Sequence, residues 1–418
     1  MQLKTIFNHV TDYKPFVVES VALTDEDNPK LEITMRAREN GLPTCSGCGE
    51  RQPGYDRLPT VRCFEFVPLW MIPVVLLYRM RRVDCSTCGK VKVEQVPWAT
   101  GKSRLTTEYK WFLSTWARRM SWAEVARCFH VSWEHVYRSV QHAVSWGLKH
   151  RDLDGIASIG VDEVQWKRGH KYQTLVYQID QGRKRLLWIG PERTAKTLLR
   201  FFRFLGKERT QQLQFVCSDM WQAYLKVIAK KAPQAIHVLD RFHVMQKLGQ
   251  AIDKVRAAEV KRLKADGYEE HLKGGRWLLL KRPENLSDKQ AIKLETLLEY
   301  NLTSVRAYLM KEDFQQFWTY TYAGWAGKFL DSWCTRAMRS KIEPIKKAAK
   351  TLRQKRELLL NWFRADRALS SGVVEGFNNK LKLVTRKSYG FRTQEAYETA
   401  LYHNLGALPE PNLTHRFC

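Results

Sequence analysis

The sequence predicts an α/β protein with a mixed β-sheet, a small β module before it and an α-helical insertion within it. Strand-like and helix-like segments alternate between Gly155 and Asp240 in the order β-β-β-α-β-α-β, which is typical of a sheet covered by helices. From Arg241 to about Arg367 the pattern is helical throughout. Two Cys-x-x-Cys pairs near the N-terminus predict a separate small module.

Four of the nine cysteines form these pairs, and each pair is followed by glycine. The residues are Cys45, Cys48 and Gly49, then Cys85, Cys88 and Gly89. Each turn lets two thiolates reach one ion, so two such turns predict a closed, structural Zn²⁺ site. The strand-like segment RCFEFVPLWMIPVVLLYRMRRV would form a hairpin that brings the pairs together. A thioredoxin-type redox role is the alternative, although neither pair opens a helix after a buried strand.

The stretch from Leu105 to about Leu148 has helical periodicity. Within it, SWAEVARCFHVSWEHVYRSVQ has the form of a helix-turn-helix, with the turn at His-Val-Ser. The second helix would present four residues to a DNA major groove: Trp133, Glu134, Tyr137 and Arg138. An ordinary packed helical hairpin has similar periodicity and is the alternative.

The strand candidates ASIGVDEV, YQTLVYQID and RLLWIG follow from Gly155, and the turn QGRK separates the last two. Thr194 then opens the helical stretch AKTLLRFFRFLG. QFVCSD, WQAYLKVIAKKA and AIHVLD complete the series as strand, helix and strand. This order resembles the mixed sheet of a ribonuclease-H-like fold.

Asp162, Asp219 and Glu375 stand where such a fold would need metal ligands. Asp162 falls near the end of the first strand, Asp219 lies just past the fourth, and Glu375 heads the basic helical segment SSGVVEGFNNKLK. Carboxylates at the carboxyl ends of neighbouring strands converge on one crevice. Mg²⁺ needs oxygen ligands, and two such ions in one site can activate water and stabilise a leaving oxygen.

Each acid also has a plainer interpretation. Asp162 could form a local ion pair, and the side chain of its neighbour Glu163 would point to the opposite face. Asp219 is a suitable helix N-cap, and Glu375 could pair with Lys382 on the same helix face. The three acids together favour catalysis, because all occupy matching places in one fold.

Three further residues are candidates for accessory roles. Lys382 lies seven residues after Glu375, so helical geometry puts both on one side, where Lys382 could hold a DNA phosphate. Asp240 and His243 follow the fifth strand and could orient a strand end or help the reacting water. A satisfied local hydrogen bond is the alternative for that pair. For Asn378 and Asn379 the spacing does not discriminate between roles.

The charge predicts a polyanionic partner. The chain of 418 residues has 70 Lys plus Arg against 43 Asp plus Glu, a net charge of +27. Residues 1–100 are nearly neutral, whereas residues 336–395 carry 16 basic and 5 acidic side chains. A solvated charged face is the alternative, but the excess of one sign favours salt-dependent binding of nucleic acid.

No apolar stretch reaches the ~18 residues that a membrane span needs. The longest, VPLWMIPVVLLY, is interrupted by Pro68 and Pro73, and the N-terminus lacks a secretion pattern. We therefore expect a cytoplasmic, reducing location in which the cysteines do not form a disulfide framework.

At these residues the chain resembles bacterial insertion-sequence transposases of the DDE type, and most closely their ISL-three family. The matching pieces are CSGCG, CSTCG, SWAEVARCFHVS, IGVDE, CSDMWQAY, DRFHV, SGVVEGFNNKLK and TRKSYGFR. They run from about Cys45 to Arg392. Together they are specific, although each alone is weak.

The resemblance implies that Asp162, Asp219 and Glu375 hold two Mg²⁺ ions, with Mn²⁺ as a substitute. It implies that the N-terminal modules recognise terminal inverted repeats in double-stranded DNA, and Arg386 and Lys387 in TRKSYGFR are further candidates for DNA contacts. Cleavage at an end of the element would free a 3′-hydroxyl that attacks target DNA. Pairing two ends implies a homodimer or larger assembly, acting in the bacterial nucleoid.

Two other functions stay open at this point. A domesticated regulator would keep DNA binding and use the catalytic fold as a scaffold. A structure-directed nuclease on the same fold would cleave without joining strands.

The sequence thus predicts three parts. These are residues 1–98 as a zinc-binding β module, 99–152 as a helix-turn-helix, and 153–418 as a catalytic domain with a helical insertion at about 262–366.

Overall fold

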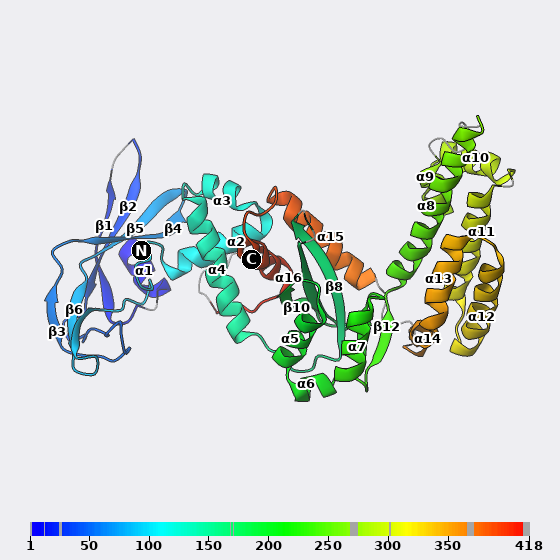
Figure 1. Cartoon of the computed structure of the whole chain (residues 1–418). Coiled ribbons are helices and arrows are strands. Elements are labelled where there is room, and N and C mark those ends of the chain that lie inside the picture. The colour runs from blue at the N-terminus through cyan, green and yellow to red at the C-terminus, as the bar shows by residue number, and fades with distance from the viewer. Residues whose placement is uncertain are drawn as a thin grey trace. The chain divides into compact units, whose positions relative to one another are not determined.

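The computed structural model describes residues 2–11, 13–24, 27–167, 169, 171–267, 275–300, 302–365 and 372–412, and gives only the backbone of 372–375. The chain forms two compact units (Figure 1): Met1–Arg151 together with Lys382–Cys418, and Asp152–Leu381. In the described part, no helix is both long enough and apolar enough to cross a membrane.

The first unit begins with a four-stranded sheet in the order β1-β2-β5-β4, against which helix α1 packs. Its elements are α1 (Leu3–Val10), β1 (Phe16–Thr24), β2 (Lys30–Ala37), β4 (Arg62–Leu69) and β5 (Ile72–Tyr78). Alternate residues of β2 are buried, as a strand with one core face requires. Trp98 is fully buried in this core and meets Phe16 edge-on, with ring centroids 4.8 Å apart.

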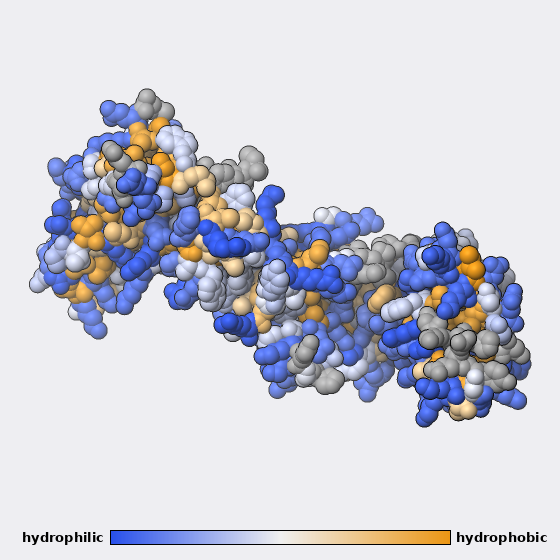
Figure 2. Space-filling model, turned by 90° about the horizontal axis from the view of Figure 1, so that it is seen from above, coloured by the Kyte–Doolittle hydropathy of each residue, from blue (hydrophilic) through white to orange (hydrophobic). Residues whose placement is uncertain are grey.

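The predicted hairpin between the cysteine pairs is confirmed, because β4 and β5 pair antiparallel. Its two-residue turn is Trp70–Met71, whose φ angles are 52° and 68°. Turns of this kind favour Asn and Gly, because both central residues need positive φ. This turn instead has two large hydrophobic residues, and Trp70 and Met71 are 77% and 83% exposed. Figure 2 shows hydrophobic surface interrupting the hydrophilic one over this N-terminal part.

A second, three-stranded sheet carries the cysteine pairs, in the order β3 (Gly54–Arg57), β6 (Arg81–Cys85) and β7 (Lys90–Val93). Glu94, just after β7, ties it to the larger sheet. One Glu94 carboxylate oxygen accepts hydrogen bonds from the Tyr78 hydroxyl at 2.7 Å and the Arg81 backbone N–H at 2.6 Å. The other pairs with the Arg81 guanidinium at 2.8 Å.

Three helices follow: α2 (Thr107–Arg119), α3 (Trp122–Cys128) and α4 (Trp133–His150). The last two form the predicted helix-turn-helix. Ser121 caps α3 in a capping box with Glu124, and the Ser132 hydroxyl caps α4 by accepting the His135 N–H. Three buried valines of α4 pack into the core shared with α2 and α3: Val136, Val140 and Val144.

The C-terminal end of the chain also belongs to this first unit. Its helix α16 (Gln394–Leu405) packs on α4, and Phe391 meets Trp122 with ring centroids 5.8 Å apart. The catalytic domain was predicted to span residues 153–418, and the second compact unit spans Asp152–Leu381. Helix α15 (Gly372–Lys387) contributes residues to both units.

The second unit contains a five-stranded sheet in the order β10-β9-β8-β11-β12. The strands are β8 (Ser158–Lys167), β9 (Lys171–Ile179), β10 (Lys184–Pro191), β11 (Phe215–Ser218) and β12 (Ile236–Leu239). The first three pair antiparallel, and β11 lies parallel to both β8 and β12. This mixed arrangement fits the predicted ribonuclease-H-like core.

Helices cover both faces of this sheet (Figure 1). On one face lie α5 (Ala195–Leu205) and α7 (Gln222–Lys231), and the short α6 (Lys207–Gln211) leads from α5 to β11. Their apolar residues share a core with Ile159 and Val161 of β8. On the other face, Phe377 of α15 stacks on Tyr177 of β9, with ring centroids 4.4 Å apart and planes 12° from parallel.

The placement of Asp162 near the end of its strand was wrong. Strand β8 continues to Lys167, because it stays paired with β9 as far as Lys167 and Lys171. Its parallel pairing with β11, however, ends at Val161 and Ser218. Asp162 is therefore in the middle of a long strand but at the end of that strand's parallel pairing.

The stretch predicted to be helical is helical where the structure describes it. Its helices are α8 (Arg241–Ala265), α9 (Arg276–Leu280), α10 (Asp288–Leu298), α11 (Thr303–Gln315), α12 (Ala323–Arg339), α13 (Glu343–Gln354) and α14 (Arg356–Arg364), with short 3₁₀ turns at Pro283–Asn285 and Gln316–Thr319. Buried Glu259 of α8 caps α11 by accepting the backbone N–H groups of Thr303 and Ser304, both at 2.8 Å.

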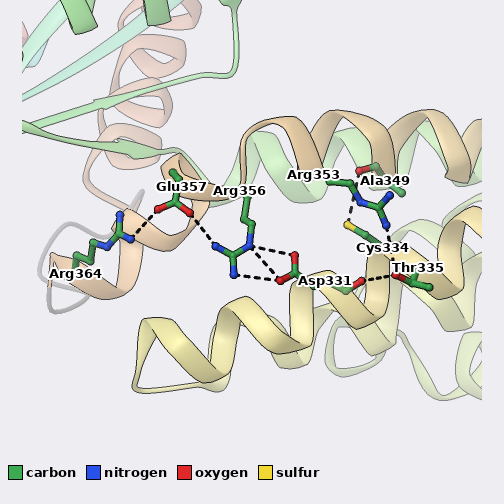
Figure 3. A network of polar contacts seen from close by, with 8 residues as sticks. All are labelled: Asp331, Cys334, Thr335, Ala349, Arg353, Arg356, Glu357 and Arg364. Atoms are coloured by element: carbon green, nitrogen blue, oxygen red, sulfur yellow. Dashed lines mark hydrogen bonds and ion pairs between the residues drawn. The ribbon is translucent and has the colours of Figure 1, made fainter.

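Arginines hold the last of these helices together (Figure 3). The Arg356 guanidinium donates hydrogen bonds to the Asp331 carboxylate of α12 from Nε and from a terminal nitrogen, at 3.1 Å each. It also donates to the Glu357 carboxylate at 2.8 Å. Glu357 in turn accepts from Arg364 at 2.8 Å. A side chain at Gly327 would meet Arg356 at 2.6 Å, so this glycine makes room for the guanidinium.

We expect Glu94→Ala to loosen the N-terminal sheets, because it leaves Arg81 and Tyr78 without their buried acceptor. Breaking a buried pair costs about 3–5 kcal/mol. Hydrogen exchange of the full chain should show faster exchange across β5–β7 (72–93). Glu39→Ala is the control, since the Glu39 side chain is 90% exposed. Unchanged exchange in the Glu94 variant would contradict this role.

Candidate active site and metal centres

Three carboxylates lie at one level of the sheet. Val161, Ser218 and Leu239 are register partners across the parallel strands β8, β11 and β12. The residue that follows each of them is an acid: Asp162, Asp219 and Asp240. Parallel strands end at the same edge, so their next residues lie side by side. The register therefore aligns Asp162 with Asp219, and it adds Asp240 to the row.

Asp162 is buried and faces helix α15. One of its oxygens accepts a hydrogen bond from the Asn378 side-chain amide at 2.6 Å, and the other accepts the Glu163 backbone N–H at 2.8 Å. Burial raises the pKa of Asp162, while these two hydrogen bonds oppose that rise. Asn378 thus connects α15 to the row of acids. Its spacing in the sequence did not reveal this contact.

Glu375 lies in the first turns of α15, three residues before Asn378. The structure gives its backbone position, while its side chain lies outside the described atoms. Residues three apart share a helix face. By its backbone position, Glu375 therefore shares a face of α15 with Asn378, which contacts Asp162.

Arg193, which the sequence did not single out, joins two acids. Its guanidinium pairs with the Glu163 carboxylate and donates to the Asp219 carboxylate at 2.9 Å. It also lies over the Trp221 ring, 4.7 Å from the centroid. Burial raises the pKa of Glu163 to about 7, although Arg193 lowers it. As predicted from strand alternation, Glu163 points away from the face of Asp162.

Asp219 is held at two points. Its second oxygen accepts the backbone N–H of Trp221 at 3.0 Å, just before α7 begins. The helix-capping alternative for Asp219 is thus partly realised, by a turn before the helix. With Arg193 on one oxygen and this turn on the other, the carboxylate has a fixed orientation at the edge of the sheet.

Asp240 and His243 form a pair at the start of α8. One Asp240 oxygen caps the helix by accepting the Phe242 N–H at 2.8 Å, and the other lies 2.8 Å from His243 Nδ1. Burial lowers the pKa of His243, but the Asp240 hydrogen bond and the charges of Asp240, Asp162 and Asp219 outweigh it and raise the pKa to about 9. The imidazole is therefore positively charged at neutral pH.

The donor set at this edge suits a hard divalent cation. In the described residues, three carboxylates lie in this row (Asp162, Asp219 and Asp240), with the cations Arg193 and His243 beside Asp219 and Asp240. All the donors are oxygens, which Mg²⁺ prefers. The surplus of negative charge is what a bound divalent cation would neutralise.

The four paired cysteines converge on one point. Their sulfur atoms all lie within 4.8 Å of one another, which makes them a candidate metal-binding group among the described residues. Sγ of Cys45 lies 3.9 Å from that of Cys88, and Sγ of Cys48 lies 3.5 Å from that of Cys85. Tetrahedral zinc with Zn–S bonds of about 2.3 Å puts sulfurs about 3.8 Å apart. The cluster is therefore compatible with structural zinc.

The local backbone supports this cluster. N–H groups of Cys48 and Gly47 lower the pKa of Cys45 to about 6, which favours the thiolate. Gly49 and Gly89 have φ angles of 78° and 60° and close the two turns. A Cβ on Gly47 would meet the Cys88 sulfur at 2.9 Å. Gly47 was not singled out from the sequence, because only the folded turn brings it against the opposite pair.

The predicted DNA-contact residues have different environments. Trp133 is 60% exposed, and Arg138 pairs with Glu134 at 2.7 Å on the surface of α4. Tyr137 instead packs against Trp122, with ring centroids 5.1 Å apart. The Lys387 ammonium donates to the Ala117 and Arg118 carbonyls at 3.2 and 2.9 Å. Lys387 thus caps α2, which is a structural role that the sequence did not indicate.

The other two basic candidates on α15 are free of such contacts. Lys382 and Arg386 are exposed, and neither forms an ion pair with another described residue. Lys382 lies four residues after Asn378, on the same face of the helix as the contact with Asp162.

Comparison with known proteins identifies the family. The profile of the ISL3 (ISL-three) DDE transposases, described as "Transposase", matches residues 159–401. The "Transposase for insertion sequence element IS1001" of Bordetella parapertussis is 30% identical over 387 residues, 92% of this chain and 94% of that protein. The "Transposase for insertion sequence element IS1557" of Mycobacterium tuberculosis is 29% identical over 412 residues, 92% and 91% respectively. The chain belongs to the ISL3 family of DDE transposases.

We expect Gly47→Ala to reduce the zinc content of the purified chain, because the added methyl group would press on the Cys88 sulfur. Cys45→Ser, which removes a ligand, should reduce it further. Elemental analysis of the full-length protein measures both. Ser46→Ala is the matched control, since Ser46 is exposed and neighbours the same turn. Stoichiometric zinc in the Cys45 variant would exclude the four-cysteine site.

The pair of Asp240 and His243 predicts a pH-dependent stability. The folded-state pKa of His243 is raised to about 9 from its ordinary 6.5. The stabilisation is therefore complete below pH 6.5 and is lost as the pH rises through 9. Thermal unfolding with divalent ions chelated should show a gap between wild type and His243→Gln that closes over this window. The exposed His9→Gln is the control; a constant gap would refute the ion pair.

Proposed function

We propose that this transposase cleaves DNA at the terminal inverted repeats of its insertion sequence in a Mg²⁺-dependent reaction and joins the freed 3′ end to target DNA. Asp162, Asp219 and Glu375 would be the catalytic carboxylates. The observation that carries the proposal is the strand register that sets Asp162 beside Asp219, with α15 docked on Asp162 through Asn378. Family membership supports DNA as the substrate.

Asp162, Asp219 and Glu375 would hold the magnesium. When bound, the metal stabilises the negative charge that develops on the phosphate oxygens and on the leaving oxygen. The side chains around the acids set their orientation. Asn378 donates to the Asp162 carboxylate and so favours its ionised form against the effect of burial. Arg193 and the Trp221 N–H fix the two oxygens of Asp219.

Asp240 and His243 extend this arrangement. His243 is cationic and hydrogen-bonded to a buried carboxylate, so its ring is held with a positive charge facing the acids. A positive group at this place can attract a DNA phosphate to the edge of the sheet without competing as a metal ligand. We propose a role in positioning the DNA strand for this pair.

The N-terminal unit would recognise the ends of the element. In α4, Trp133 and the Glu134–Arg138 pair lie on the exposed side of a capped second helix, as a recognition helix requires. The zinc module would stabilise the β-sheets that precede the helix-turn-helix. Two DNA ends must be brought together for joining, so the active form would be a homodimer or larger assembly on DNA.

Asp162→Asn, Asp219→Asn and Glu375→Gln should each abolish cleavage of terminal DNA and leave its binding within about twofold, because each removes charge without changing shape. Cleavage and joining are measured on labelled terminal duplexes in Mg²⁺, and binding in its absence. Near-normal cleavage by any variant would remove that residue from the site. Binding without cleavage by wild type would favour a regulator, and cleavage without joining a nuclease.

Asn378→Ala should lower the rate of cleavage roughly 10- to 100-fold, the loss expected when a residue that orients a metal ligand is removed. The loss should shrink at raised Mg²⁺ concentration or higher pH, since both favour the ionised Asp162. Asn379→Ala is the matched control, because it is the exposed neighbour on the same helix. Equal effects of the two variants would mean that Asn378 only supports the helix.

A further inference from the structure

A hollow of about 690 Å³ lies within the helical part of the second unit, between α8, α9 and α11. Its volume is within the ~300–1,000 Å³ of ordinary small-ligand sites. Residues of all three helices line it, among them Arg241, Phe242, Arg276, Trp277, Arg282 and Lys311. None of these residues was predicted to have a role, and the catalytic proposal does not use them.

The charge of the lining calls for an anion. Four cations, Arg241, Arg276, Arg282 and Lys311, face one carboxylate, Asp253. Asp253 is shared, because it accepts from Arg256 at 2.8 Å and lies 3.3 Å from Arg276. Burial and the nearby charge of Arg282 lower the pKa of Arg241. An anion between these cations would relieve their repulsion.

Lys311 strengthens this argument, because it is only 4% exposed. Its ammonium pairs with the adjacent Glu312 at 2.8 Å and lies 5.3 Å from the centre of the Tyr308 ring. Burying a lysine ammonium costs free energy unless groups of opposite charge surround it. Arg241, which lies over the Trp318 ring at 5.3 Å, has an Nε with no hydrogen-bond partner among the described residues.

The rest of the lining is aromatic and amide. Phe242 and Trp277 remain 48% and 56% exposed although they border the hollow. The Arg276 guanidinium lies 5.3 Å from the Trp277 ring centre, which widens the flat stacking surface. Gln246, Gln250 and Gln315 add amide groups that can both donate and accept hydrogen bonds. Cations, flat rings and amides together match a nucleotide: phosphate, base face and base edge.

The place of the hollow fits the DNA substrate. Arg241 and Phe242 are the first residues of α8, whose N-cap is Asp240 in the row of acids. The helix rises about 1.5 Å per residue, so the near wall of the hollow starts within one turn of that acid. A DNA strand end processed at the acids would have its neighbouring nucleotides within reach of the hollow.

We propose that this hollow binds an unpaired nucleotide of the DNA strand next to the cleavage point. The proposal rests on the proposed function, since that function places a DNA strand at the acids. Trp277 and Phe242 stack the base, and Arg241, Arg282 and Lys311 hold its phosphate. An open hollow of about 690 Å³ between three helices admits one or two nucleotides but not a double helix, so the site selects single-stranded DNA.

A second basic hollow gives a useful contrast. It lies between α8 and α13 and is lined by Lys247, Lys254 and Lys347, with Glu343, but by no aromatic residue. Such a surface can contact a duplex backbone without reading bases. The difference between the two hollows is the stacking surface, which is therefore the feature to test.

The test uses the full-length chain without divalent metal. A duplex with a single-stranded overhang of about ten nucleotides, carrying 2-aminopurine in the overhang, is compared with the blunt duplex. Wild type should quench 2-aminopurine and bind the overhang DNA more tightly. Trp277→Ala should lose the quenching and weaken overhang binding roughly tenfold, as removal of a stacking ring does. Trp277→Phe should retain both, since it keeps a ring.

The matched control is Trp325→Ala. Trp325 lies on α12, is 60% exposed and lies 4.6 Å from a lysine ammonium, but it does not line the hollow. Equal effects of the Trp277 and Trp325 variants, or an equal loss of blunt and overhang binding in Trp277→Ala, would overturn the proposal. Blunt-duplex binding by wild type without overhang preference also overturns it and leaves the proposed function intact. Failure of wild type to bind either DNA would count against the proposed function itself.

Discussion

The parallel register of β8, β11 and β12 is the constraint on which the candidate site depends. Because Val161, Ser218 and Leu239 are partners, the next residue of each strand falls at the same level. Backbone hydrogen bonds, rather than contacts among the acids, thus hold Asp162, Asp219 and Asp240 together. Such a scaffold can keep like charges close, since the sheet and its two helical layers oppose their repulsion.

That repulsion explains the neighbours of the acids. Arg193 lies between Glu163 and Asp219, and His243 is held in its charged form beside Asp240. Asp162 has instead a neutral partner, Asn378, which leaves its charge in place. The arrangement therefore places a cation beside Asp219 and another beside Asp240, and leaves Asp162, at the β8 end of the row, for a bound cation. This distribution agrees with a site that binds an oxygen-preferring metal.

Local patterns made much of this predictable. The Cys-x-x-Cys turns, the capped helix-turn-helix and the strand order each depend on residues close in sequence, so spacing was sufficient. Contacts across the chain were not accessible in the same way. Arg193, Asn378 and the capping role of Lys387 depend on pairings that only the fold creates. The extent of β8 was misjudged because its pairing with β9 continues through polar residues to Lys167, beyond the apolar run.

Helix α8 links the acids to the hollow in the helical part. Its first residue follows Asp240, and a buried stripe that includes Val244, Leu248 and Ile252 holds it in place. Farther along, Glu259 caps α11 and so fixes the helix that carries Lys311. The two walls of the hollow are therefore tied to each other and, through a rigid helix, to the row of acids. An insertion that served only as a spacer would not require a buried glutamate to lock these helices together, nor a buried lysine at the hollow.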